Sequence, residues 1–175
     1  MLALAPLCAL AVDAPKAVEP VKLADRIYTF SNTMANSTAI VGDESVILVD
    51  SGENPQAAAA LQAAIAKLTP KPVRVLVNTH WHFDHANGNE ALGAAGVVVV
   101  AQKEVRPRMI AGKGLAVSPS FPTLAYDKAE LALPTVNFDR ELTLRSGDEE
   151  VQLVHPAAGS AHTDGMRTRS SRSAR

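Results

Sequence analysis

Cysteine is nearly absent from this chain, since Cys8 is the only one among 175 residues. A single thiol excludes an intramolecular disulfide framework, and it leaves no group of cysteines that could hold a zinc ion. Any metal ion bound by this protein must therefore be held by histidine, aspartate or glutamate side chains.

Aromatic residues and net charge are scarce as well. Phenylalanine, tryptophan and tyrosine make up 4% of the chain, too little for a stacking platform that binds single-stranded nucleic acid. The 17 lysines and arginines nearly balance the 18 aspartates and glutamates, so no overall basic field favours a nucleic-acid partner. No apolar run is long enough to cross a bilayer. We therefore expect neither nucleic-acid binding nor a transmembrane segment.

The first residues form a short apolar run that ends in Ala-Leu-Ala at residues 9–11. This run resembles the apolar region and small-residue cleavage site of a secretory signal peptide. We therefore expect residues 1–14 to be a signal-peptide remnant and the protein to be periplasmic or secreted. No Lys or Arg precedes the run and Pro6 interrupts it. The alternative is an apolar N-terminus without a targeting function, which would leave the protein in the cytoplasm.

The middle of the chain has the pattern of one mixed domain with an ordinary core, since 47% of the residues are apolar. Apolar runs and alternation predict strands over residues 21–30, 36–42, 45–50, 73–77, 97–100, 141–144 and 151–155. Other segments predict helices over residues 54–68, around 89–92 and over 101–111. Residues 112–134 are rich in Pro, Ser and Gly and predict a long loop. The mixture indicates an α/β sheet with helices on its faces.

Four potential metal ligands follow the predicted strand 73–77 directly. In the stretch NTHWHFDHANGN over residues 78–89 they are His80, His82, Asp84 and His85. At this chain's own frequencies of His and Asp, the H-x-H-x-D-H pattern arises by chance roughly once in five thousand chains. An incidental His-rich surface loop would not follow a buried strand so directly, so we interpret the motif as a metal site.

The spacing of the motif suits two neighbouring metal ions. In an extended segment residues i and i+2 point to the same side, so His80 and His82 can face one metal together. Asp84 and the adjacent His85 are then expected to serve the second metal. Imidazole and carboxylate ligands without thiolate suit Zn²⁺, with Fe or Mn as alternative occupants.

This motif after a buried strand resembles the signature of the metallo-β-lactamase superfamily. Residues 47–52 (ILVDSG) look like the family's strand that ends in Asp-Thr/Ser-Gly, and residues 161–165 (AHTDG) are similar to its later histidine motif. The resemblance covers residues 21–165. It implies an α/β fold, the αββα sandwich of the family, over a partial domain at residues 20–165.

The resemblance also implies roles for individual residues. His162 would be the third ligand of the first zinc ion, and Asp50 would support the metal loop. The family's reaction is hydrolysis, in which a metal-bound hydroxide attacks a carbonyl or phosphoryl centre. Asp84 would orient that water or accept its proton, besides binding the second metal.

The chain departs from the family's pattern after Gly165, where it continues as MRTRSSRSAR. The family's bridging Asp and last His have no counterpart there, and no strand or helix period is visible. We interpret residues 166–175 as a frameshifted or basic tail, with a tail that binds an acidic partner as the alternative. A chain truncated in this way is expected to leave an open sheet edge and an uncovered apolar face, and to have little activity.

The function that these observations predict is metal-dependent hydrolysis of a carbonyl-type small molecule such as a β-lactam, a thioester or a lactone. One or two zinc ions are the expected cofactors, the second lacking its usual remaining ligands. The secretory start and the lack of a basic groove favour a periplasmic hydrolase of small molecules, and this preference rests on analogy at the level of the fold. The alternative is an inactive fragment that binds one zinc ion through His80, His82 and His162.

Overall fold

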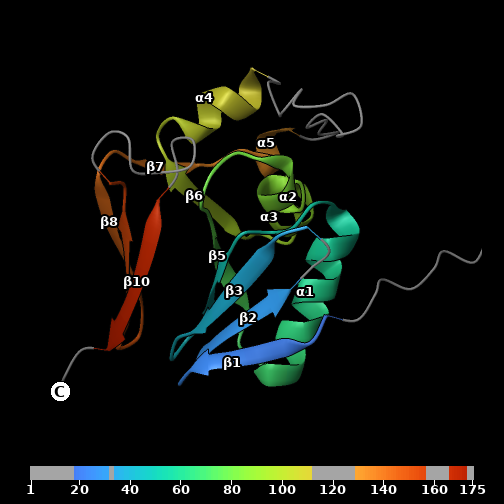
Figure 1. Ribbon diagram of the computed structural model, residues 1–175, viewed down its shortest axis with the longest axis vertical. Coiled ribbons are helices and arrows are strands. Elements are labelled where there is room, and N and C mark those ends of the chain that lie inside the picture. Colours follow the sequence, from blue (N-terminus) through green and yellow to red (C-terminus); the bar gives the residue numbers. More distant parts are fainter. Residues whose placement is uncertain (1–17, 32–33, 112–128, 157–165, 173–175) are drawn as a thin grey trace, which may run out of the picture.

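The computed structural model describes residues 18–31, 34–111, 129–156 and 166–172. They form three layers, in which helices cover one face of a large sheet and a smaller sheet packs on its other face (Figure 1). The predicted α/β class is confirmed. The predicted signal segment at residues 1–14 and the predicted ligand His162 lie outside the described residues.

The large sheet has seven strands, which lie side by side in the order of the chain. The first four pair antiparallel as a meander, and each later strand pairs parallel to the one before it. The strands are β1 (Pro20–Ala24), β2 (Ile27–Ser31), β3 (Asn36–Val41), β4 (Val46–Val49), β5 (Val73–Asn78), β6 (Val98–Gln102) and β7 (Val136–Phe138).

The parallel strands are joined through helices, because a parallel pair cannot be closed by a tight turn. Helix α1 (Pro55–Leu68) connects β4 to β5, and α2 (Phe83–Ala86) and α3 (Asn89–Ala94) connect β5 to β6. The apolar face of α1 packs on the sheet through Ala58, Leu61, Ala64 and Ile65. The remaining helices are α4 (Val105–Ile110) and α5 (Ala129–Ala132).

The smaller sheet has the order β10-β9-β8 and is antiparallel throughout. Its strands are β8 (Glu141–Ser146), β9 (Glu149–Val154) and β10 (Arg167–Arg172). Alternate residues of β9 are buried, as expected of a strand with one face on the core. Val151 and Leu153 on that face pack with Ile47, Val77 and Val100 of the large sheet, which joins the two sheets into a sandwich.

The tail that we expected to lack regular structure is a strand as far as residue 172. All six residues of β10 pair with β9, from Arg167 opposite Val154 to Arg172 opposite Glu149. The expectation was wrong because β10 has no apolar alternation of its own and is ordered by backbone pairing with a neighbour. That pairing cannot be read from local sequence.

On the outer face of β9 and β10, the expected uncovered apolar surface is not found. Residues opposite one another in an antiparallel pair share a face, so Arg167 and Arg169 lie beside Val154 and Gln152 on the side away from the core. Glu150 lies on the same side of β9, where no residue of that strand is fully buried. This face is mainly polar, and it therefore does not need an apolar cover.

Three further elements differ from the predicted boundaries. Residues 21–30 are two strands, because the chain turns at Arg26, whose φ of 63° places it in the left-handed region. The predicted loop 112–134 includes helix α5, and β7 follows it unpredicted. The predicted helix 101–111 begins only after β6 ends at Gln102. Within the described segments no helix is both long and apolar enough to span a membrane.

Candidate metal centre

Two loops meet at the edge of the large sheet where the parallel strands β4 and β5 end. Val49 lies opposite Val77 in this pair, so the residues that follow each strand emerge side by side. The Asp50 backbone N–H donates to the carbonyl oxygen of Val77 at 2.9 Å. This pairing brings the Asp-Ser-Gly segment against the histidine motif, although about thirty residues separate them in the chain.

Asp50 is the residue that links the two loops. Its side chain is buried, with 3% exposure, and its carboxylate accepts hydrogen bonds from the Thr79 backbone N–H at 2.8 Å and the Thr79 hydroxyl at 2.7 Å. The carboxylate also contacts the Nδ1 atom of His85 at 2.7 Å. Asp50 therefore holds the histidine loop, which is the kind of contact expected of it. Its effect on a bound metal stays a prediction.

The hydrogen bonds around Asp50 fix the ring nitrogen that carries the proton in two histidines. A carboxylate only accepts, so Nδ1 of His85 is the donor to Asp50. The single hydroxyl hydrogen of Thr79 goes to Asp50, so Nδ1 of His80 donates to the Thr79 oxygen at 3.0 Å. In the neutral form of both rings the lone pair is then on Nε2, the nitrogen through which they would bind a metal.

The pKa of His85 is raised above its ordinary value. Burial favours the neutral ring and lowers the pKa, but the hydrogen bond to Asp50 and the charges of Asp50 and Asp84 outweigh it. A proton on Nε2 would compete with a metal ion for this nitrogen. The negative charges of Asp50 and Asp84 therefore favour a metal ion and a proton alike.

The predicted ligands of the motif lie together in one cluster. The ring of His80 is 4.5 Å from that of His82 and 4.1 Å from that of His85, measured between centroids. Nε2 of His85 lies 3.4 Å from Oδ2 of Asp84. His80 and His82 are each 7% exposed, so the cluster opens to solvent mainly through Asp84 and His85. The division of these four residues between two metals stays a prediction.

The chemistry of the cluster fits a zinc ion, but its geometry does not complete a site. Imidazole nitrogens and carboxylate oxygens are the donors that zinc takes in the absence of thiolates. Within the described ranges, however, no set of three or more His, Cys, Asp or Glu side chains is arranged to hold a metal ion. The described residues thus gather suitable donors, and metal binding itself belongs to the proposal below.

The site also contains a set of buried polar residues that the sequence motifs did not predict. Asn78, Asn89 and Ser51 lie beneath the histidine loop and are fully buried, with exposures of 0%. Their position beside the motif is visible in the sequence, where Asn78 ends a buried strand. A polar residue in such a place needs a hydrogen-bonding partner, which is the signal that could have found it.

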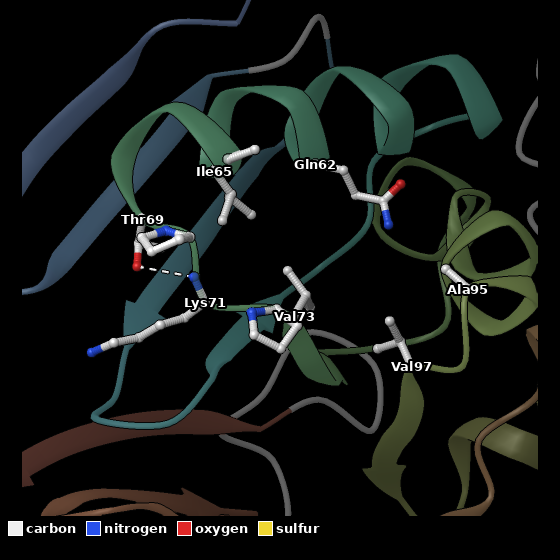
Figure 2. A pocket seen from close by; sticks show the side chains of 10 residues that line it. Gln62, Ile65, Thr69, Lys71, Val73, Ala95 and Val97 are labelled. Atoms are coloured by element: carbon white, nitrogen blue, oxygen red, sulfur yellow. Dashed lines mark hydrogen bonds between the residues drawn. The ribbon is translucent and has the colours of Figure 1, made fainter.

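A separate cavity of about 340 Å³ lies at the amino-terminal end of β5, away from the histidine motif (Figure 2). It is lined by residues at the end of α1 and the start of β5, among them Ile65, Thr69, Lys71 and Val73. The histidine motif follows the carboxyl end of β5, so this cavity is not part of the candidate metal centre.

The family of the chain follows from its match to a family model. The model of the metallo-beta-lactamase superfamily matches residues 31–171. Because this range includes most of the 175 residues, the chain belongs to the metallo-beta-lactamase superfamily. The resemblance seen in the motifs is confirmed, and so is the fold class that it implied.

Solved structures with the same fold include the metallo-beta-lactamase from Pontibacter korlensis. It matches with a TM-score of 0.66 and 20% identity, over 86% of this chain and 66% of its own. The MIM-2 metallo-beta-lactamase matches with a TM-score of 0.67 and 21% identity, over 93% of this chain and 60% of its own. At such identities the likeness shows the fold alone.

One curated protein that is similar to part of this chain is named as a sulfatase and not as a β-lactamase. The linear primary-alkylsulfatase of Pseudomonas sp. (strain ATCC 19151) is 38% identical over 52 residues, which is 30% of this chain and 10% of the sulfatase. The chain thus spans a tenth of this relative and less than two thirds of the solved structures above. The activity and substrate of the whole protein are therefore matters of proposal.

Proposed function

We propose that this chain is a zinc-dependent hydrolase that acts on a small molecule with a carbonyl-type reacting centre. The observation that supports it most is the cluster of His80, His82, Asp84 and His85, in which His85 is hydrogen-bonded to Asp50. Membership of the metallo-beta-lactamase superfamily makes hydrolysis the expected class of reaction.

The residues of the cluster would divide the work as follows. A bound zinc ion lowers the pKa of a water molecule towards neutrality and so supplies the nucleophile. His80 and His82 would hold a first ion together with His162, and Asp84 and His85 would hold a second; His80 and His85 would bind through Nε2. Asp84 would orient the attacking water and accept its proton, as its position 3.4 Å from His85 supports. Asp50 would keep the rings of His80 and His85 in the binding tautomer.

The substrate class rests on weaker support than the reaction. A β-lactam, a thioester or a lactone fits the carbonyl chemistry, and similarity to solved metallo-beta-lactamases favours the first. The alkylsulfatase relative adds sulfate esters to the classes that should be tested. A periplasmic or secreted location remains part of the proposal.

The experiment is a zinc titration of the purified chain followed by a substrate panel. Zinc affinity is measured by competition with a chromogenic chelator, and turnover is then measured on a β-lactam, a thioester, a lactone and an alkyl sulfate. Turnover that a chelator abolishes, and that Asp84→Asn reduces at least tenfold, supports the proposal. Turnover that persists in the chelator would contradict it.

The second candidate is metal binding without turnover. It is favoured by the small number of predicted ligands for a second ion, namely Asp84 and His85. Zinc binding at one equivalent together with no turnover on any member of the panel would identify it. Absence of zinc binding would exclude both candidates.

A further inference from the structure

Two of the buried polar residues beside the histidine motif, Asn78 and Asn89, form a pair of side-chain amides that are joined by two hydrogen bonds. Nδ2 of Asn89 donates to Oδ1 of Asn78 at 2.7 Å, and Nδ2 of Asn78 donates back to Oδ1 of Asn89 at 3.1 Å. Asn89 also donates to the Ala132 carbonyl oxygen at 2.9 Å and accepts from the Ser51 hydroxyl at 2.7 Å. Both hydrogens and both lone pairs of the Asn89 amide are therefore used, which fixes its orientation.

The pair continues to the main chain of His85. The second hydrogen of the Asn78 amide goes to the His85 carbonyl oxygen at 3.3 Å, and the Ser51 backbone N–H donates to the same oxygen at 2.8 Å. The Ser51 hydroxyl has one hydrogen, and its contact to Asn89 at 2.7 Å is shorter than its contact to His85 at 3.1 Å. The hydroxyl therefore serves Asn89, and the two N–H donors hold the carbonyl.

His85 is thus held at its main chain and at its ring by the two residues that follow β4 and by the last residue of β5. Its carbonyl oxygen is fixed by Ser51 and Asn78, and its ring is fixed by Asp50 at 2.7 Å. A shift of the carbonyl group would also move the Cα atom of His85. Because the side chain is short, the ring would then move relative to Asp50, to which its Nδ1 atom is bonded. Groups buried at 0% exposure cannot take water as a replacement partner without opening the core.

We propose that Asn89 and Asn78 are positioning residues, which set the main-chain position of His85 and so aim its Nε2 atom at the candidate metal. This inference rests on the proposed zinc site for its consequence, but not for its geometry. Asn89 also bonds to Ala132 in α5, so it ties that helix to the same pair. A ligand of the metal centre is in this way held by three separate elements.

Asn89→Asp is the test variant, because it keeps the shape of the side chain and exchanges its donor for an acceptor. Asn78 and Ala132 each lose a hydrogen-bond donor. Gln102→Glu is the matched control, since Gln102 is a 2% exposed amide that bonds to Asp139 and Glu104 and not to the histidine loop. Both variants place a carboxylate where a buried amide was, so loss of stability alone affects both.

The first measurement uses the full chain without added zinc and labelled with ¹⁵N-histidine. NMR should show the Nδ1–H of His85 in wild type as a slowly exchanging signal, because it is hydrogen-bonded to Asp50. We expect the signal to be lost or shifted in Asn89→Asp and kept in Gln102→Glu. The second measurement is zinc affinity, which should fall 10- to 100-fold in Asn89→Asp and less than about threefold in the control.

An unchanged signal and affinity in Asn89→Asp, or equal losses in Gln102→Glu, would overturn the inference. If wild type binds no zinc, the proposed function fails, and the NMR signal alone decides whether the amide pair positions His85. If Asn89→Asp does not fold, Ser51→Ala takes its place, because it removes only the hydroxyl bonded to Asn89. A smaller change of the same signal supports the inference, and no change contradicts it.

Discussion

Among single residues, Asp50 combines a strained backbone with several hydrogen bonds inside the site. Its φ of 61° lies in the left-handed region, which Asp and Asn tolerate better than most residues. Its carboxylate holds Thr79 and His85 and acts on His80 through the Thr79 hydroxyl. Such strain persists only where surrounding contacts fix the conformation, as they do here.

Asp50→Asn should weaken zinc binding more than it weakens the fold. Asn tolerates the positive φ, but it offers one oxygen acceptor and one amide donor in place of two acceptors, so the bond to Nδ1 of His85 or to Thr79 is lost. We expect zinc affinity to fall about 10- to 100-fold, measured by chelator competition. Asp50→Ala should lower the melting temperature further, since alanine tolerates the positive φ less well. Equal zinc affinity in wild type and Asp50→Asn would contradict the role given to the carboxylate.

At the scale of elements, helix α1 shows how local sequence fixes a boundary. Asn54 accepts the Ala57 backbone N–H at 2.8 Å, and Pro55 occupies the first turn, where its missing N–H is harmless. Thr69 and the proline after it end the helix. Capping signals of this kind are read from the sequence alone, which is why the predicted helix 54–68 agrees with the structure to within one residue.

Replacing the cap tests the contribution of this boundary to stability. Asn54→Ala removes the acceptor for the Ala57 N–H and should lower the free energy of unfolding by about 1 kcal/mol. Asn54→Ser keeps an oxygen that can cap and should recover most of the loss. Urea denaturation of the three proteins measures both values. An alanine variant as stable as wild type would show that the cap contributes nothing.

Strand β10 is the opposite case, since its order depends on its neighbours. Met166, directly before it, is 8% exposed and packs with Val151 and Leu153 in the core between the sheets. Its backbone N–H donates to the Thr79 carbonyl oxygen at 3.1 Å, which brings this segment to the edge of the metal loop. The segment that the sequence pattern indicates as a frameshifted or basic tail therefore begins inside the core.

Met166→Ala tests whether this segment is part of the folded domain. Truncating a buried methionine should lower the free energy of unfolding by about 2 kcal/mol or more. Thr168→Ala, an exposed position of β10, is the control and should change it by less than about 0.5 kcal/mol. Urea denaturation distinguishes the two. If Met166→Ala is as stable as wild type, the segment is not packed as the structure has it.

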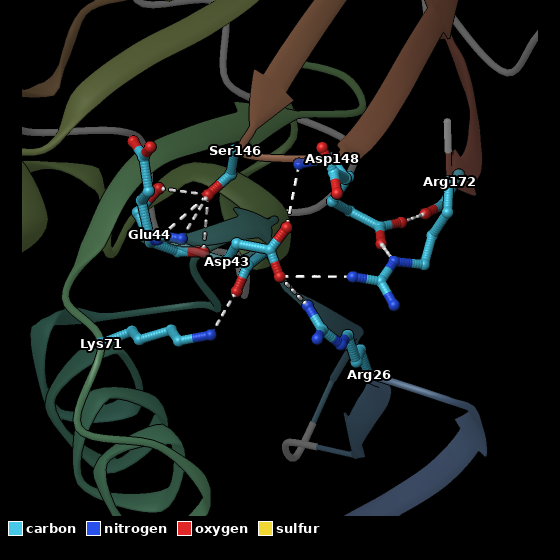
Figure 3. Close-up of polar contacts among 11 residues, drawn as sticks. Arg26, Asp43, Glu44, Lys71, Ser146, Asp148 and Arg172 are labelled. Carbon is cyan, nitrogen blue, oxygen red and sulfur yellow. Dashed lines mark hydrogen bonds and ion pairs between the residues drawn. The ribbon is translucent and has the colours of Figure 1, made fainter. Parts of the chain in front are cut away.

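At the scale of the whole molecule, a charged cluster joins the two sheets at the end away from the histidines (Figure 3). Asp43 accepts from Arg26 at 2.5 Å, from the Asp148 backbone N–H at 2.9 Å and from Arg172 at 3.3 Å. These partners belong to the turn after β1, the turn after β8 and the end of β10. A single carboxylate thus connects the large sheet to the smaller one.

The pKa of Asp43 gives this connection a pH dependence. The Arg26 hydrogen bond first, and the Asp148 N–H second, lower the pKa from 3.8 to about 2. A lowered pKa in the folded state stabilises the fold above pH 3.8, and this stabilisation is lost as the pH falls towards 2. Asp43→Asn should therefore be less stable than wild type at neutral pH and lose less stability on acidification over that range.

Thermal melts of wild type and Asp43→Asn between pH 5 and about pH 2 measure this difference. Asp25→Asn is the control, because Asp25 is an exposed carboxylate that pairs with Lys22 at 3.7 Å. The control should follow the wild-type curve. Parallel curves for wild type and Asp43→Asn would show that the cluster does not contribute to acid stability.

Local sequence was enough to predict the central elements and the identity of the candidate ligands. The motif residues His80, His82, Asp84 and His85 lie together because their spacing is local and follows the buried strand β5. Continuous apolar runs and helix caps depend on neighbours in the chain, so they predicted β4, β5, β6 and α1. Family membership also followed from local motifs.

Which distant residues became partners depends on the three-dimensional fold. The pairing of β4 with β5 sets Asp50 against His85, and the amides of Asn78, at the end of β5, and Asn89, at the start of α3, meet in the core. The ordering of β10 on β9 is decided in the same way. Hydrogen bonds between segments depend on strand register and on which groups lose water in the core, and neither quantity is contained in local sequence.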